Sequence, residues 1–172
     1  MLHKGYIQVY TGNGKGKTTA ALGLSLRAVC AGNKVFFGQF MKGQECSEKK
    51  AQLILPGFTL EQFGNSCFIN DTPTEKDISC AAHGLERIRG ILVSREYDLV
   101  VLDEINTAVF FKLIPVEEVL SVLSIKPEKT EIVMTGRYAP QEIIDSADLV
   151  TEMKEIKHYY NKGVDARIGI EN

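Results

Sequence analysis

The segment Thr11-Gly12-Asn13-Gly14-Lys15-Gly16-Lys17-Thr18-Thr19 decides the fold of this chain. It follows the apolar run Tyr6-Ile7-Gln8-Val9-Tyr10 and precedes a segment with helical periodicity. It matches the phosphate-loop pattern G-x-x-x-x-G-K-[ST] except at the first position, where threonine replaces glycine. Glycines let backbone N–H groups approach phosphate oxygens, and the following helix presents the positive end of its dipole. The pattern therefore predicts a site for a nucleoside triphosphate.

Each residue of the loop has an expected role. The Lys17 ammonium is expected against the phosphates, and the Thr18 hydroxyl is expected to hold Mg²⁺. The residues expected to wrap around the phosphates are Gly12, Asn13, Gly14, Lys15 and Gly16.

Further polar residues follow two other apolar runs. Asp103 and Glu104 end the run that begins at Leu99, which has the composition of a central parallel strand. The carboxyl end of such a strand faces the ligand crevice, so Asp103 is expected to hold hydrated Mg²⁺, directly or through water, with Glu104 facing substrate or solvent. Arg137 follows the run 130–135 and is expected at the same edge, where it would neutralise triphosphate charge.

The rest of the chain alternates strands with helices. Strands are expected at residues 6–10, 34–41, 58–63, 99–104, 130–135 and 148–152, and helices at 20–31, 47–55, 115–125 and 140–146. A long helix is expected to start at Thr72-Pro73-Thr74-Glu75, with the buried face Ile78, Ala81, Ala82, Leu85, Ile88 and Leu92. This order predicts one α/β domain over residues 1–172, of the P-loop NTPase type, with a mainly parallel sheet and helices on both faces.

Composition limits the classes of function. The formal net charge is −2 and no block of lysine or arginine occurs, so a general nucleic-acid binder is not expected. No apolar run approaches the roughly 20 residues of a membrane span, and no signal-peptide core follows Met1, so we expect a cytoplasmic protein without a membrane partner. The four cysteines are irregularly spaced and indicate neither a zinc site nor a disulfide framework.

These motifs leave several functions open. A P-loop ATPase would use Asp103 for Mg²⁺ and Glu104 to activate water. A small nucleoside kinase would also need a phosphate loop and an acidic base, although the thymidine kinase type adds paired cysteines for zinc, which are absent here. A non-catalytic nucleotide sensor is the third alternative.

Taken as a whole, the chain resembles the P-loop ATP:corrinoid adenosyltransferases, a family associated with cobalamin synthesis and salvage. The core Gly12-Asn13-Gly14-Lys15-Gly16-Lys17-Thr18 is much narrower than a generic phosphate loop. The other blocks that carry the resemblance are Arg27-Ala28-Val29, Gln39-Phe40-Met41-Lys42-Gly43, Val100-Val101-Leu102-Asp103-Glu104, Thr135-Gly136-Arg137-Tyr138-Ala139-Pro140, Ala147-Asp148-Leu149-Val150-Thr151-Glu152-Met153, Lys157-His158 and Gly169-Ile170-Glu171.

The resemblance implies an enzyme that moves the 5′-deoxyadenosyl group of ATP to Co(I) of cobalamin or a precursor corrinoid and releases triphosphate. Co(I) is itself a strong nucleophile, so placement and charge are the protein's work. Lys15, Lys17, Arg137 and Mg²⁺ would stabilise the leaving triphosphate. By the same resemblance Glu104 would contact nucleotide or corrinoid, and Arg27 would help to hold the nucleotide.

One departure from the family concerns the lower face of the corrin. Members often carry a Phe-x-Trp pair before the long helix, and this pair is thought to remove the lower cobalt ligand. This chain has no tryptophan, and Phe68 in Phe68-Ile69-Asn70 is the nearest counterpart. We therefore expect cobinamide, which lacks that ligand problem, to be handled comparatively well. The resemblance also implies a homodimer and a flavin-type protein as reductant.

Overall fold

The computed structural model describes residues 3–65 and 73–171, and their strands form one six-stranded sheet. The strands are β1 (Ile7–Thr11), β2 (Val35–Phe40), β3 (Phe58–Phe63), β4 (Leu99–Asp103), β5 (Glu131–Thr135) and β6 (Leu149–Glu152). Their order in the sheet is β3-β2-β4-β5-β1-β6, and every neighbouring pair is parallel. Parallel pairing brings all carboxyl ends to one edge, which is where ligands bind in sheets of this kind.

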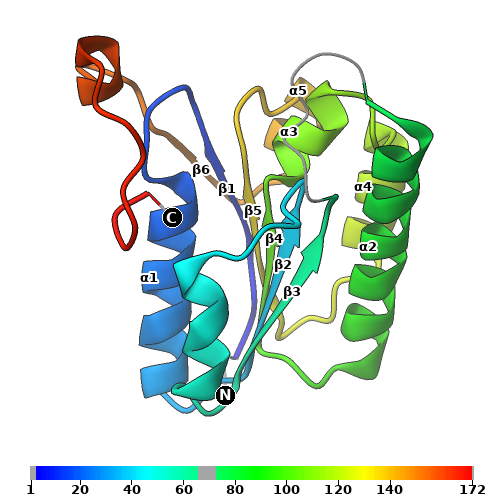
Figure 1. Cartoon of the computed structure of the whole chain (residues 1–172). Coiled ribbons are helices and arrows are strands. Elements are labelled where there is room, and N and C mark those ends of the chain that lie inside the picture. The colour runs from blue at the N-terminus through cyan, green and yellow to red at the C-terminus, as the bar shows by residue number, and fades with distance from the viewer. Residues whose placement is uncertain (1–2, 66–72, 172) are drawn as a thin grey trace.

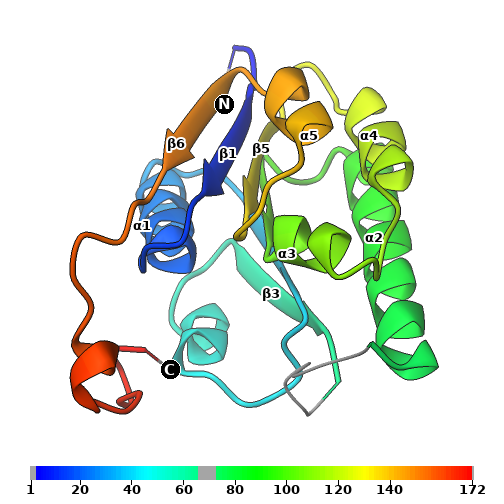
Figure 2. The ribbon, with the colours of Figure 1, turned by 90° about the horizontal axis from the view of Figure 1, so that it is seen from above.

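Helices cover both faces of the sheet, as the sequence predicts (Figure 1). The α-helices are α1 (Lys17–Cys30), α2 (Glu75–Ser94), α3 (Ile105–Phe110), α4 (Val116–Ser124) and α5 (Gln141–Ser146), and the 3₁₀ helices are η1 (Ser47–Leu53) and η2 (Tyr159–Lys162). Helix α1 and η1 lie on one face, whereas α2 to α5 lie on the other (Figure 2). No helix in the described part of the chain is both long and apolar enough to cross a membrane.

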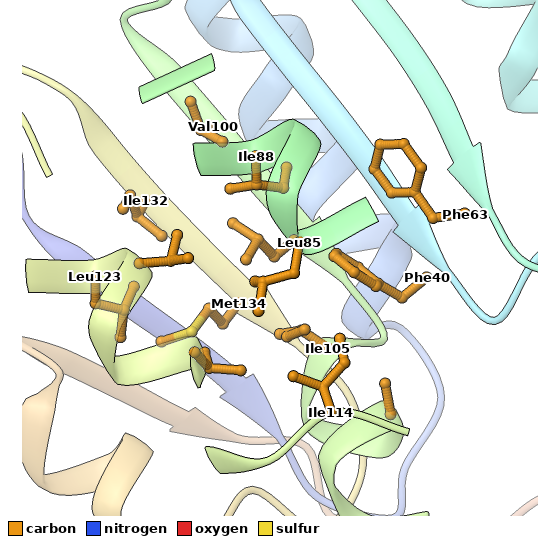
Figure 3. Packing of buried hydrophobic residues seen from close by; sticks show 14 of the residues in the cluster. Phe40, Phe63, Leu85, Ile88, Val100, Ile105, Ile114, Leu123, Ile132 and Met134 are labelled. Carbon is orange, nitrogen blue, oxygen red and sulfur yellow. The ribbon is translucent and has the colours of Figure 1, made fainter. Parts of the chain in front are cut away.

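The apolar core is divided by the sheet into two clusters. Along β4 the buried side chains alternate between them: Val100 and Leu102 belong to the cluster under α2 to α5, and Leu99 and Val101 to the cluster under α1. Figure 3 shows the larger cluster, where side chains of β2, β3 and β5 pack against those of α2, α3 and α4. Full burial of one such side chain contributes about 1.5–3 kcal/mol to the stability of the fold. Because the central strands bury many of them, these strands hold the carboxyl edge rigidly.

Several predicted boundaries are wrong by a few residues. Helix α1 begins at Lys17 rather than residue 20, because Gly16 already serves as its N-cap. Helix α2 begins at Glu75, because Thr74 rather than Thr72 is its N-cap and forms a capping box with Asp77. The segment expected to be a helix at 47–55 is the 3₁₀ helix η1. Helix α3 was not predicted, since six residues are too few to establish a helical period.

The buried face of α2 also differs slightly from the prediction. Ile78 and Ala82 are exposed, whereas Gly84 and Ile91 are buried. Residues 78 and 82 are four positions apart and lie together on one stripe of the helix, and that stripe faces away from the sheet.

Candidate nucleotide site

The phosphate loop joins β1 to α1 and packs against the segment that follows β6. Gly12 has a φ of 97°, and a Cβ atom there would lie 2.4 Å from the carbonyl oxygen of Met153. The Gly14 N–H donates to the same carbonyl oxygen at 2.6 Å, and the Glu155 N–H donates to Asn13 Oδ1 at 3.0 Å. Only glycine fits at position 12, because the backbone of another segment occupies the space of a side chain.

Lys17 lies over the loop with its ammonium group held by backbone oxygens. Its Nζ donates to the carbonyl oxygens of Gly12 at 2.8 Å and Gly14 at 2.7 Å, and the residue is 6% exposed. Burial lowers the pKa of Lys17, and this effect outweighs that of the nearby carboxylates of Glu104 and Asp103, which raise the pKa. A partly desolvated ammonium interacts strongly with any phosphate that replaces these carbonyl groups.

Asp103 is fully buried at the end of β4, and both of its carboxylate oxygens accept hydrogen bonds. Oδ1 accepts from Thr18 Oγ1 at 2.8 Å and from Thr135 Oγ1 at 2.6 Å. Oδ2 accepts from Gln39 Nε2 at 3.3 Å and lies 3.5 Å from Lys42 Nζ. The contact between Thr18 and Asp103 brings a hydroxyl and a carboxylate oxygen together directly below the loop.

These two oxygens fit the donor set of Mg²⁺. This ion prefers oxygen ligands and is usually bound by one or two carboxylates together with substrate phosphates and water. Among residues 3–65 and 73–171, no group of three or more His, Cys, Asp or Glu side chains forms a closed metal cage. Thr18 and Asp103 would therefore supply only part of a coordination shell.

Glu104 and Arg137 are held next to each other by Thr107 of α3. Glu104 has a φ of 61°, its N–H donates to Thr135 Oγ1 at 3.0 Å, and its Oε2 accepts from Thr107 Oγ1 at 2.5 Å. The Arg137 N–H donates to the same Thr107 Oγ1 at 3.1 Å. Burial, and then the charge of Asp103, raise the pKa of Glu104. A left-handed glutamate costs about 1–3 kcal/mol, a strain typical of functional sites.

A cavity of about 610 Å³ opens at this edge. The residues that line it are Gly14, Lys15, Gly16, Lys17, Thr18, Thr19, Leu22, Lys42, Ser47, Glu48, Glu104, Arg137, His158, Gly169, Ile170 and Glu171. The structure thus brings together Lys15, Lys17, Thr18, Glu104 and Arg137, with Asp103 bonded to Thr18 below.

One expected nucleotide contact, Arg27, is not among the described residues that line this cavity. Arg27 lies in the last turn of α1 and lines a separate cavity of about 420 Å³. The helix rises about 1.5 Å per residue, so this turn is roughly 15 Å along the axis from Lys17. Contact between Arg27 and the nucleotide therefore stays a prediction. Phe68 lies outside the described residues.

The site contains residues to which the sequence analysis assigns no individual role. Gln39 and Lys42 come from the end of β2, next to β4, and both contact Asp103. Lys42, Glu48 and Glu171 also line a second cavity of about 530 Å³, which adjoins the first. Their signal in the sequence is weak, because polar residues at a strand end become informative only once the strand order is known.

Residues of the carboxyl-terminal segment, the red end of the ribbon in Figure 1, line both cavities. Glu171 Oε1 lies 3.3 Å from Lys15 Nζ, and Lys15 Nζ also donates to the Ile170 carbonyl oxygen at 3.2 Å. Arg167 and Tyr159 donate to the Glu171 carboxylate, and together with Lys15 they hold its pKa well below the usual value. Lys15 of the loop is therefore paired with Glu171 in the carboxyl-terminal segment.

Comparison with known proteins agrees with this geometry. A family model described as ATP:corrinoid adenosyltransferase BtuR/CobO/CobP matches residues 3–172. A corrinoid adenosyltransferase of Escherichia coli (strain K12) is 34% identical over 168 residues, covering 98% of this chain and 86% of that protein. The corrinoid adenosyltransferase CobA of Salmonella typhimurium is 35% identical over 168 residues, with the same two coverages of 98% and 86%.

A solved structure supports the fold alone. The flagellar accessory protein FlaH from Methanocaldococcus jannaschii superposes with a TM-score of 0.61 at 12% identity, covering 87% of this chain and 71% of that chain. The phosphate loop, the carboxyl edge and the match over residues 3–172 agree on one assignment. The chain belongs to the ATP:corrinoid adenosyltransferase family.

Proposed function

We propose that this chain transfers the 5′-deoxyadenosyl group of ATP to Co(I) of cobalamin or of a precursor such as cobinamide, and releases triphosphate. The family match over residues 3–172 carries this proposal. The two adjoining cavities support it, because a transferase must hold two substrates with their reacting atoms in contact. The phosphate loop lines the 610 Å³ cavity and assigns ATP to it, which leaves the adjoining cavity for part of the corrinoid.

The reaction needs no base from the protein. The lone pair of Co(I) forms a bond to C5′, the C5′–O bond breaks, and its electron pair remains on the triphosphate oxygen. Placement of C5′ in line with cobalt is then the main contribution to rate, together with stabilisation of the growing negative charge.

Cations that line the ATP cavity supply that stabilisation. Lys15, Lys17 and Arg137 line this cavity together with the phosphate loop. Lys17 would exchange two backbone carbonyl groups for phosphate oxygens, and this exchange is favourable because the new partner is charged. Glu104 is assigned to contact with nucleotide or corrinoid.

Thr18 and Asp103 would hold Mg²⁺ at the base of the loop. The ion would supply positive charge to the triphosphate oxygens when bound. Thr135 donates to one oxygen of Asp103 and Gln39 to the other, and these hydrogen bonds orient the carboxylate for this role.

The remaining parts of the proposal come from the family resemblance. They are a homodimer, a flavin-type protein as reductant, a cytoplasmic location where ATP is available, and Phe68 as one half of the wedge under the corrin. The absence of tryptophan leaves Phe68 as the aromatic candidate in its segment.

Anaerobic incubation with ATP, Mg²⁺ and chemically reduced cobalamin tests the function. We expect a light-sensitive adenosylcobalamin spectrum, with intact triphosphate released only when Co(I) is present. Hydrolysis is the second candidate, because Glu104 is a carboxylate of raised pKa that lines the ATP cavity. Production of ADP and phosphate at a catalytic rate without corrinoid would contradict the transferase and favour hydrolysis.

A further inference from the structure

Lys42 lies at the junction of the two cavities. It follows β2, and its side chain lines both the 610 Å³ and the 530 Å³ spaces. Its Nζ lies 3.5 Å from Asp103 Oδ2 and 3.4 Å from Glu48 Oε1, and about one third of its side chain is exposed. The ammonium group is thus anchored on one side and open toward both substrate spaces on the other.

A network of buried amides fixes this position. Gln39 is fully buried, and its Nε2 donates to Glu48 at 3.0 Å and to Asp103 at 3.3 Å, the same two carboxylates that hold Lys42. Gln62 Nε2 in turn donates to Gln39 Oε1 at 3.1 Å. The two carboxylates cannot separate without breaking these bonds, so they form a rigid cradle for one cation.

The position matters because of where the bond breaks. The phosphate loop binds the triphosphate from the side of α1, and the adenosyl group must reach the acceptor in the adjoining cavity. The C5′–O bond therefore lies at the junction, and the oxygen that keeps the electron pair belongs to the α-phosphate. Lys15, Lys17 and Lys42 are the described lysines that line the ATP cavity, and of these three Lys42 alone also lines the adjoining cavity.

We propose that Lys42 is a catalytic residue whose ammonium group donates a hydrogen bond to the α-phosphate oxygen that leaves C5′. Lys42 keeps its proton, because the departing oxygen becomes a terminal phosphate oxygen stabilised by charge alone. Glu48 is a positioning residue that holds Lys42 in place. The inference rests on the proposed adenosyl transfer and adds a residue to it.

The test compares Lys42→Met with Lys50→Met, which removes an exposed lysine from η1. With chemically generated Co(I)cobalamin, Lys42→Met should lower kcat about 100-fold or more, as expected for a lost contact to developing charge. The dissociation constant for ATP should change by less than about fivefold, because the contact strengthens mainly in the transition state. Lys50→Met should leave both values unchanged, and Lys42→Arg should recover part of the rate.

A double-mutant cycle tests the role of Glu48. Glu48→Gln should lower kcat in the wild-type background and have little further effect in Lys42→Met, since residues acting as a unit are not additive. The thermal midpoint of each variant reports folding, and Lys42→Arg and Glu48→Gln serve if Lys42→Met does not fold. A kcat for Lys42→Met within about threefold of an active wild type would overturn the inference. Loss of ATP affinity without loss of kcat would overturn it too. If the wild type itself transfers nothing, the proposed function is refuted instead, and the inference with it.

Discussion

Replacing Gly12 by alanine tests how far the fold of the loop determines the activity. A Cβ atom at this position would lie 2.4 Å from the Met153 carbonyl oxygen and 2.8 Å from the Met153 nitrogen. Both atoms belong to the backbone, so no side chain can rotate away. Ordinary contacts begin at 3.4 Å, and the loop or the segment after β6 must therefore move by about 1 Å.

The cost can be estimated from two contributions. The φ of 97° is unfavourable for alanine by about 1–3 kcal/mol, which corresponds to a thermal midpoint about 2–12 °C lower for a chain of this size. A 1 Å displacement of the groups that position a substrate costs about 100-fold in rate. We therefore expect Gly12→Ala to lose both stability and about 100-fold in kcat/KM for ATP.

Gly23→Ala is the matched control. Gly23 lies within α1, and a Cβ atom there would meet nothing within 4 Å. Alanine in a helix interior is more stable than glycine by about 0.8–1 kcal/mol. This variant should therefore have a thermal midpoint about 2–4 °C higher, with unchanged activity. Thermal unfolding and steady-state kinetics of the two variants measure both effects. An unaltered midpoint and kcat/KM for Gly12→Ala would refute the reasoning, as would an equal loss of activity in Gly23→Ala.

Three further predictions concern single side chains. Lys17→Ala should lose about 2–4 kcal/mol of transition-state stabilisation, measured as kcat/KM, because the ammonium at the triphosphate is removed; near-normal turnover in the folded variant would contradict its role. Thr74→Ala should cost about 1 kcal/mol near neutral pH because the cap of α2 is lost. Hydrogen bonds from Thr74 lower the pKa of Asp77 from 3.8. The stability that the ionised Asp77 carboxylate contributes is therefore present above pH 3.8 and is lost as the pH falls through the lowered pKa. The gap between wild type and Thr74→Ala in urea unfolding should therefore narrow at low pH, and a constant gap would count against the capping box. Phe68→Ala should impair adenosylation from Co(II) with a protein reductant more than adenosylation from Co(I) made chemically, and equal losses would assign Phe68 to packing.

The sequence predicts those parts of the site that depend on local patterns. The phosphate loop has its own motif, and the apolar runs before Asp103 and Arg137 predict buried strands that end at one edge. The parallel sheet then brings these residues together, and no further sequence pattern is needed to predict that they meet. The same rule explains why the fold class is confirmed by the strand order although several helix boundaries are wrong.

Long-range contacts are the part that local patterns do not reveal. Gln39 and Lys42 reach Asp103 because β2 and β4 are neighbours, and that adjacency is a property of the whole sheet. Glu171 reaches Lys15 although 156 positions separate them in the chain, through a segment with no regular period. Arg27 lies in the last turn of α1, away from the loop, and its contact with the nucleotide stays a prediction.

The internal pairing of the cations bears on how a highly charged product leaves. Lys15 is paired with Glu171, Lys42 with Glu48, and Lys17 with backbone carbonyl groups. Bound triphosphate would take over contacts from these internal partners, and the partners would recover the cations when it leaves. Because each lysine exchanges one partner for another, release of triphosphate avoids the cost of leaving a partly buried ammonium group unpaired. Under the proposed function, the acidic residues around this site would thus favour turnover, whereas a site with cations alone would retain its product.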